Sequence, residues 1–254
     1  MLSRLLRQFL FVLIHVVVGI LVAGQNVYHR FLNKLRVFSR DEVTKSDIRM
    51  LLQCVPRFSK KLKHLVVIAD TDHHPLSELA RVVIWSLIAG VPYVSFHDIT
   101  GSLKENEEKF FLEVERKKKG IPGCIKWSNK PDLNGYSNGT QAHTVIVHIL
   151  TADDGRPKIV QCIQDIVQEK IQCNRESTEF TVQEFQDALD VVYPTMPDPE
   201  IALYTGRLCS TYGLLPWQIR LTEFIQLSLD HSIHINDFVG ALHKYNKCDQ
   251  RFGK

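Results

Sequence analysis

The apolar residues of this chain follow two spacings, which predict strands and helices in alternation. Continuous apolar runs are typical of strands buried on both faces of a parallel sheet, and apolar residues that recur every three or four positions are typical of amphipathic helices. The expected strands are 62–69, 91–96, 143–150 and 200–204. The expected helices are 75–89, 102–119, 157–171, 182–192, 216–229 and a last one from about residue 235.

This alternation predicts an α/β fold, with a central, mostly parallel sheet covered by helices on both faces. Two of the helices begin with the spacing of a capping box, in which a hydroxyl and a carboxylate bind the first free backbone amides. The pairs are Ser102 with Glu105 and Thr181 with Glu184. Residues 120–142 are rich in Gly, Pro and Asn, so we expect a loop there.

The N-terminus departs from this globular pattern. Residues 9–24 are apolar except for His15, and this span is short of the ~20 residues that a transmembrane helix typically needs. Leu5 and Leu6 can extend it if Arg7 reaches the lipid interface. Basic residues are more frequent after the run than before it, which favours an anchor with the rest of the chain in the cytosol. A cleaved secretory signal peptide is the alternative.

We therefore divide the chain into three parts. Residues 1–24 are expected to form an N-terminal membrane helix, and residues 25–61 a basic linker with a leading helix. The leading helix begins after Asp41 or Ser46, and Pro56 closes it. Residues 62–254 are expected to form the α/β domain.

The composition narrows the classes of partner and site. A net charge of +3, without basic residues interleaved with aromatic ones, argues against nucleic acid as a partner. The six cysteines are scattered without a Cys-x-x-Cys pair, so neither a zinc site nor a disulfide framework is indicated. Free thiols fit the reducing cytosol. Asn138 lies in a glycosylation sequon, which matters only if the domain lies in a secretory lumen.

Polar residues follow the first two expected strands, at the edge where open α/β sheets usually bind ligands. Residues 70–74, Asp-Thr-Asp-His-His, could supply metal ligands, but adjacent residues rarely point at one ion. A strand-end turn that caps the next helix is the simpler interpretation. His97 and Asp98 follow the second strand, and such residues most often cap or are solvated. We therefore assign no metal site to this chain.

The segment 198–224 is the most informative for function. It contains Tyr-Thr-Gly at 204–206 and Leu-Pro-Trp-Gln at 215–218. The cis-prenyltransferases have a run with an Arg, a Thr or Ser, a Gly, a Glu and a later Arg, followed by a Leu-Leu-Trp-Gln-like sequence, in this order. The chain also ends in Arg-Phe-Gly-Lys at 251–254, which is similar to the Arg-x-Gly tail of many subunits in that family. The chain thus resembles the cis-prenyltransferases over about residues 62–254.

The charged residues of that family pattern are replaced in this chain. With 217–218 as the anchor, the family's arginines fall on Tyr204 and Ser210, and its glutamate falls on Leu208. Diphosphate needs fixed cations, which these three residues do not supply. Asp70 matches the family's Mg²⁺-binding Asp but lacks the Gly-Asn-Gly-Arg that should follow it. The resemblance therefore implies a retained fold with lost catalysis, and we assign no catalytic residue to this chain.

The resemblance implies a non-catalytic, activating subunit of a heteromeric cis-prenyltransferase, similar to the accessory subunits of the dehydrodolichyl diphosphate synthase complex. The catalytic partner, in a heterodimer or higher heteromer, would hold Mg²⁺ and elongate farnesyl diphosphate with isopentenyl diphosphate. This would occur at the endoplasmic reticulum membrane, for dolichol synthesis and protein glycosylation. Arg251 and Gly253 would reach the partner's substrate site, and the expected interface residues are Trp217, Arg220 and Phe224.

Three alternatives stay open. The chain could be a membrane-tethered receptor or lipid-binding module without an enzymatic role. It could also be a self-sufficient synthase that uses Asp70, although the missing cations at 204 and 210 argue against this. The expected helix 216–229 could be a doubly covered core helix, because its apolar surface is broader than a single stripe, or a subunit interface.

Overall fold

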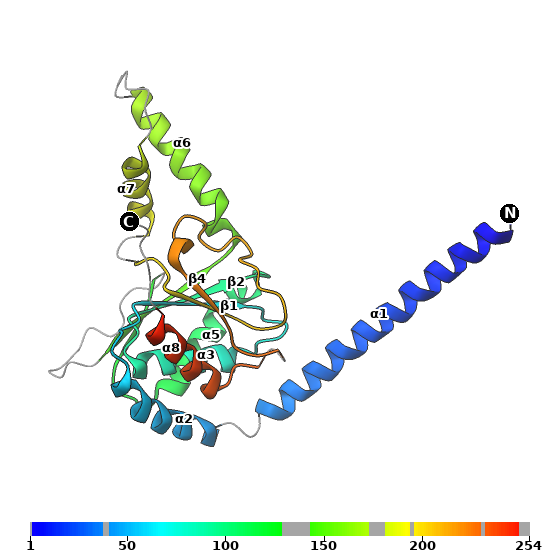
Figure 1. Ribbon diagram of the computed structural model, residues 1–254, viewed down its shortest axis with the longest axis horizontal. Helices are drawn as coiled ribbons and strands as arrows, with labels where there is room; N and C mark the ends of the chain where they lie inside the picture. Colours follow the sequence, from blue (N-terminus) through cyan, green and yellow to red (C-terminus); the bar gives the residue numbers. More distant parts are fainter. Residues whose placement is uncertain are drawn as a thin grey trace. The chain divides into compact units, whose positions relative to one another are not determined.

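A computed structural model describes residues 2–37, 41–128, 143–172, 181–193, 196–229 and 232–248 (Figure 1). The chain divides into two compact units, Met1–Lys45 and Ser46–Lys254. The first unit contains helix α1, and the second contains the α/β sheet. Each unit is described by itself below.

Helix α1 extends over Leu2–Val37 and therefore runs through the predicted boundary at residue 24. Residues 25–37 contain no proline, and a single glycine such as Gly24 is tolerated in a helix, so nothing in the sequence ends the helix there. The apolar side chains of α1 whose burial the structure describes, such as Phe11 at 63% and Ile20 at 66%, are exposed. Among the described residues, no helix combines the length and apolar character needed to cross a membrane, so the structure does not confirm the predicted transmembrane helix at 1–24.

The second unit is built on a six-stranded sheet in which every pair of neighbouring strands is parallel. The strand order is β3-β4-β2-β1-β5-β6. All six residues of the central strand β1 are buried, as a sheet covered on both faces requires. This confirms the predicted parallel α/β fold. The strands are β1 His64–Ala69, β2 Tyr93–Asp98, β3 Cys124–Trp127, β4 Thr144–Leu150, β5 Ile201–Tyr204 and β6 Glu223–Gln226.

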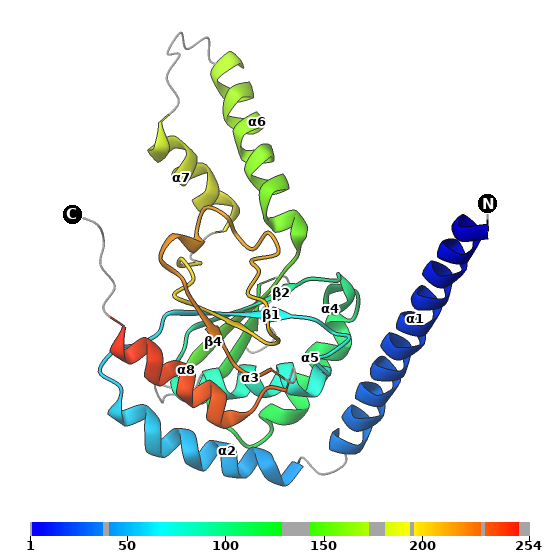
Figure 2. The same cartoon turned by 45° about the vertical axis from the view of Figure 1, so that its right-hand side comes forward.

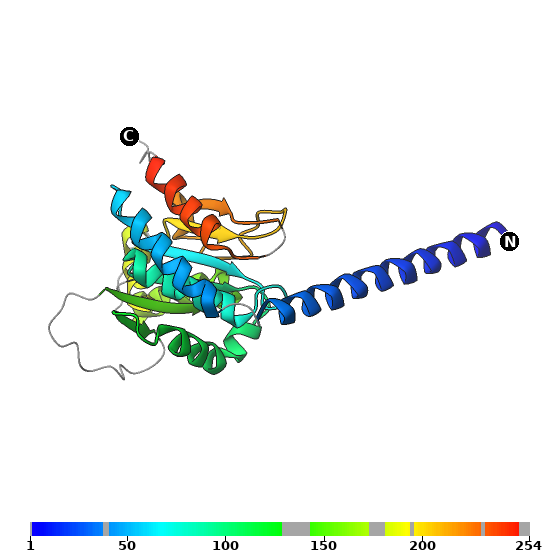
Figure 3. The ribbon, with the colours of Figure 1, turned by 90° about the horizontal axis from the view of Figure 1, so that it is seen from below.

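Helices lie on both faces of this sheet (Figures 2 and 3). Helices α2, α3, α5 and α8 lie on one face, where Leu65 and Val67 of β1 join the main core. Helices α6 and α7 lie on the other, where Val66 packs with Leu214 and Leu215 in a smaller cluster. The helices are α2 Asp41–Cys54, α3 Leu76–Ala89, α4 Ser102–Glu105, α5 Glu107–Lys118, α6 Arg156–Gln172, α7 Val182–Val192 and α8 Ile235–Lys247.

A buried polar network ties helix α3 to its neighbours on the first face. Arg81 Nη2 donates to the carbonyl of Ile233 at 3.0 Å, and the Ile233 amide donates to Glu78 Oε2 at 3.3 Å. Arg81 also lies 3.7 Å from Glu78, so the two buried charges compensate each other. Trp85 Nε1 donates to Asp47 Oδ2 at 3.1 Å. The network thereby holds α2 and the segment before α8 against α3.

The predicted helix 216–229 is wrong. The segment contains a 3₁₀ turn at Ile219–Leu221 and then strand β6, which pairs in parallel with β5. Its residues are apolar enough for a helix, but pairing with the edge of the sheet decides the conformation, since β propensity depends on the partners available. The prediction of a loop over 120–142 also missed strand β3, which pairs with β4.

One predicted capping box is confirmed and the other is wrong. Thr181 and Glu184 form the reciprocal bonds at the start of α7. Ser102 and Glu105 do not, because α4 begins after Gly101 without a side-chain cap from its own N-cap residue. The predicted helix 102–119 is also divided at Asn106, which separates α4 from α5.

Candidate functional site

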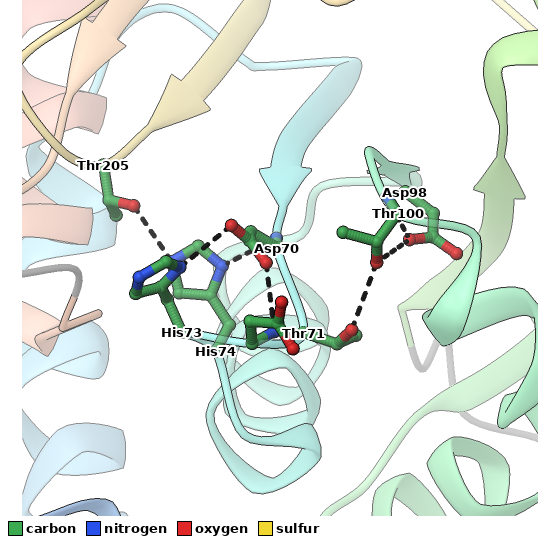
Figure 4. Close-up of polar contacts among 8 residues, drawn as sticks. Asp70, Thr71, His73, His74, Asp98, Thr100 and Thr205 are labelled. Atoms are coloured by element: carbon green, nitrogen blue, oxygen red, sulfur yellow. Dashed lines mark hydrogen bonds and ion pairs between the residues drawn. The ribbon is translucent and has the colours of Figure 1, made fainter. Parts of the chain in front are cut away.

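The turn after β1 places Asp70 where a ligand would be expected, at the carboxyl end of the central strand (Figure 4). Its two carboxylate oxygens are bound within the turn, Oδ1 to the Asp72 amide at 3.0 Å and Oδ2 to His73 Nδ1 at 2.9 Å. Its carbonyl accepts from the amides of His73 and His74. These bonds confirm the predicted strand-end turn, but the predicted cap of the next helix is wrong, because Pro75 is the N-cap of α3 and no side chain caps it.

The donor set around Asp70 does not fit a metal ion. Both oxygens of Asp70 already accept hydrogen bonds, and Asp72 is exposed beside it. Across the described ranges, no group of three or more His, Cys, Asp or Glu side chains is arranged to hold a metal. We therefore derive no metal chemistry from this turn.

His74 links this turn to the end of strand β5. Its Nδ1 accepts from the Asp70 amide at 3.0 Å, so the ring proton lies on Nε2, which donates to Thr205 Oγ1 at 3.0 Å. Thr205 directly follows β5. No sequence pattern predicts this part-buried link, because the two residues are 131 positions apart.

Asp98 at the end of β2 acts as a helix cap, as the sequence predicted for such a position. Its carboxylate accepts from the amides of Gly101 at 3.0 Å and Lys104 at 2.9 Å, which satisfies free amides at the start of α4. Thr71 and Thr100 then join the β1 and β2 turns through their hydroxyls at 3.3 Å. Both strand ends are thus held by internal hydrogen bonds.

Three histidines occupy buried or half-buried positions on the second face of the sheet. Burial lowers the pKa of His64 to about 4 and that of His148 to about 4, and it also lowers the pKa of His97. His64 bonds the Pro197 carbonyl and the Ser95 hydroxyl, and His97 Nε2 donates to the Tyr212 carbonyl at 3.0 Å. These rings are therefore neutral near pH 7 and supply no fixed positive charge for diphosphate.

The segment after β5 carries none of the charges of the family pattern at the aligned positions. Tyr204 is half-buried, Leu208 is 82% exposed, and Ser210 Oγ accepts from the Tyr212 amide. Gly206 keeps a left-handed φ of 83°, and its amide donates to the carbonyl of Ser228, which lies just after β6, at 2.8 Å. Arg207, between Gly206 and Leu208, is an exposed cation at a position where the family pattern has no charged residue.

Trp217 attaches helix α7 to the segment between β5 and β6. The Trp217 ring packs edge-on against Phe185, with centroids 4.6 Å apart, and its Nε1 donates to Gln186 at 2.9 Å. The Arg220 guanidinium lies 5.5 Å from the centre of the Trp217 ring, and its side chain is 58% exposed. Phe224 is half-buried on β6. Of the three expected interface residues, Arg220 is thus the most accessible.

A cavity of about 740 Å³ lies beside strand β4 on the second face. Its lining includes the apolar residues Ile146 and Leu150, the lysines Lys104 and Lys158, and the carboxylates of Asp153 and Asp154. His148 also lines it, and its buried Nε2 has no hydrogen-bond partner among the residues that the structure covers. The volume is within the range of small-molecule sites, roughly 300–1,000 Å³.

Several predicted features fall on residues outside the described ranges. These are the tail residues Arg251 and Gly253 and the sequon residue Asn138. Their roles therefore stay predictions.

Comparison with known proteins gives sequence relatives but no matching family model. The chain is 32% identical over 195 residues to the dehydrodolichyl diphosphate synthase complex subunit Nus1 of Mus musculus, covering 75% of this chain and 64% of that protein. It is 32% identical over 193 residues to subunit NUS1 of Homo sapiens, covering 74% of this chain and 65% of that protein. The chain thus spans slightly less than two thirds of each relative.

A solved structure supports the fold independently. The crystal structure of lavandulyl diphosphate synthase from Lavandula x intermedia matches with a TM-score of 0.55 and 15% identity, covering 76% of this chain and 99% of that one. At this identity the likeness shows the fold alone. Together, the comparisons confirm the resemblance to the cis-prenyltransferases that the motifs predicted.

The contact between Gly155 and Gly213 generates a prediction about stability. A Cβ added at Gly155 would overlap the Gly213 carbonyl oxygen, so Gly155→Ala should separate the start of α6 from the loop before Trp217. We expect it to lower the free energy of unfolding by about 1–3 kcal/mol, as overpacking typically does. The measurement is urea unfolding of the chain, followed by tryptophan fluorescence.

Gly240→Ala is the matched control for this substitution. Gly240 lies within α8 with open space around the position of a Cβ, so alanine should raise stability by about 0.5–1 kcal/mol. Equal effects of the two substitutions would contradict the close approach of Gly155 to Gly213.

Proposed function

The chain is a relative of the dehydrodolichyl diphosphate synthase complex subunits, and from this we propose that it is a non-catalytic, activating subunit of a heteromeric cis-prenyltransferase. Its partner would be the catalytic subunit, in a heterodimer or a higher heteromer. The complex would join farnesyl and isopentenyl diphosphates into dehydrodolichyl diphosphate, for dolichol synthesis and protein glycosylation. Mg²⁺ would be held by the partner.

One observation carries this proposal. The sheet of a cis-prenyltransferase-like fold is present, yet the groups at its strand ends bind one another instead of presenting charge. A diphosphate needs several fixed cations, and Tyr204, Leu208 and Ser210 stand where the family pattern has its charged residues. A chain with this surface can support the reaction only through a subunit that supplies those cations.

The interface and the tail are the contributions that we propose for this chain. Trp217, Arg220 and Phe224 lie on one segment, and β6 is the last strand at its end of the sheet. Exposed Leu221, at 44%, adds apolar surface beside Arg220. Aromatic residues and Arg are enriched at subunit interfaces. The Arg251 cation and the amides near Gly253 would bind diphosphate oxygens in the partner's site.

The purified chain alone should show no prenyl transfer and should gain it only with a catalytic partner. In that complex, Asp70→Ala should change the rate little, because the Asp70 carboxylate is used inside its own turn. The measurement is incorporation of labelled isopentenyl diphosphate by the chain, the partner and the complex. Turnover by the isolated chain that Asp70→Ala abolishes would refute the proposal and support a self-sufficient synthase.

Removal of the tail should lower the activity of the complex strongly and leave its assembly intact. Deletion of 251–254, or Arg251→Ala with Gly253→Ala, removes an electrostatic contact that is worth about 10²–10³ in rate when preorganised. Lys254→Ala is the matched control and should retain activity. The measurement is the rate and the KM for isopentenyl diphosphate in complexes matched by size-exclusion chromatography. Unchanged kinetics in the tail-less complex would contradict a role of the tail in the substrate site and would leave this chain a scaffold only.

We also propose that α1 associates with the endoplasmic reticulum membrane and that the sheet unit faces the cytosol. Support comes from the exposed apolar residues of α1 and from cysteines such as exposed Cys209, which is free. Asn138 should therefore carry no glycan in cells. Glycan at Asn138, or a mature protein that begins near Gln25, would favour a cleaved signal peptide and exclude this orientation.

A lipid-binding module without enzymatic role is the second candidate, and the cavity beside β4 favours it. Its apolar lining at Ile146 and Leu150 could contact a prenyl chain, and Lys104 and Lys158 could bind a phosphate beside the carboxylates of Asp153 and Asp154. Binding of a fluorescent prenyl phosphate by the chain alone, lost when Ile146→Trp fills the cavity, would support this candidate over the first.

A further inference from the structure

Ser59 and Lys60, which lie far from helix α8 in the sequence, bind its last turn. Asn246 Oδ1 accepts from the Lys60 amide at 3.0 Å and from the Ser59 hydroxyl at 3.2 Å. Lys60 Nζ donates to the Cys248 carbonyl at 3.2 Å and lies 4.2 Å from the centre of the Tyr245 ring. These contacts join the segment before β1 to the last residues that the structure describes.

The contacts satisfy groups that a helix end leaves free. The last carbonyls of a helix have no partner within it, and a cation near that end interacts favourably with the helix dipole. Lys60 supplies both the hydrogen bond and the charge. A lysine side chain usually stays mobile in solvent, because fixing it costs rotamer entropy. Lys60 is instead half-buried and has two partners, so its position is specified.

The backbone on either side of Lys60 is also held in place by packing. Leu62 is buried in the main core, and β1 begins at His64 in the centre of the sheet. Phe58 packs edge-on against His243 of α8, with centroids 4.9 Å apart. The end of α8 is therefore fixed relative to the sheet.

We propose that Lys60 and Asn246 are positioning residues for the C-terminal tail. They fix Cys248, the residue from which the chain continues to Arg251 and Gly253. A tail that starts from a fixed point loses less conformational freedom when it binds and has a higher effective concentration at its site. This inference rests on the proposed function of the tail in the partner's substrate site.

The test is Lys60→Met in the complex with the catalytic partner. This change keeps the length of the side chain and removes its charge and its hydrogen bond. The kcat/KM for isopentenyl diphosphate should fall about tenfold, the effect of losing one hydrogen bond to a charged group. Asn246→Ala should act in the same direction, and Lys60→Arg should restore most of the activity. Lys61→Met, at the exposed neighbouring position, is the matched control and should have no effect.

The same substitution in a complex that lacks 251–254 separates positioning from a structural role. There, Lys60→Met should cause no further loss, because its effect passes through the tail. An equal loss in the intact and the tail-less complexes would overturn the inference and assign Lys60 to folding alone. No effect of Lys60→Met where deletion of the tail lowers activity would also overturn it, while the proposed function would stand. No effect of the tail deletion itself would overturn both.

Discussion

The hydrogen bonds within the turn after β1 are the constraint on which the chemistry of this chain depends. Asp70 lies at the strand end where the fold places ligands, but its carboxylate binds the Asp72 amide and the His73 ring. His74 then connects the turn to the end of β5 through its hydrogen bond to Thr205. The two bonds of the His74 ring are part-buried, and a buried polar group left unsatisfied there would destabilise the fold. The same bonds occupy the Asp70 carboxylate and the rings of His73 and His74, and the described residues hold no group of side chains arranged for a metal.

The rest of the second unit follows from covering both faces of one parallel sheet. The first face carries the large core and a compensated buried pair, Glu78 and Arg81, which holds the segment before α8. The second face is more polar, with His64 and His148 kept neutral by burial. Packing on the first face thus fixes α8 and, through Lys60, the end of the described chain. Chemistry proposed for the tail therefore depends on packing that lies far from it in sequence.

The sequence predicted those elements that depend on the order of neighbouring residues. Continuous apolar runs located the central strands, and the spacing of Thr181 and Glu184 located the start of α7. Interactions between distant residues were not predictable in this way. Strand β6 forms because β5 offers it a partner, and the link between His74 and Thr205 joins two separate strand ends. The replaced family positions were recognised by their place in a motif, but only the structure shows that neighbouring groups use their hydrogen bonds internally.

The central claim is that this chain has no diphosphate site of its own. The most direct measurement is calorimetric titration of isopentenyl diphosphate, with Mg²⁺ present, into the purified chain and into Asp70→Ala. The account predicts no binding tighter than ~1 mM in either protein, since no fixed cations stand at the aligned positions. Micromolar binding by the chain that Asp70→Ala abolishes would contradict it.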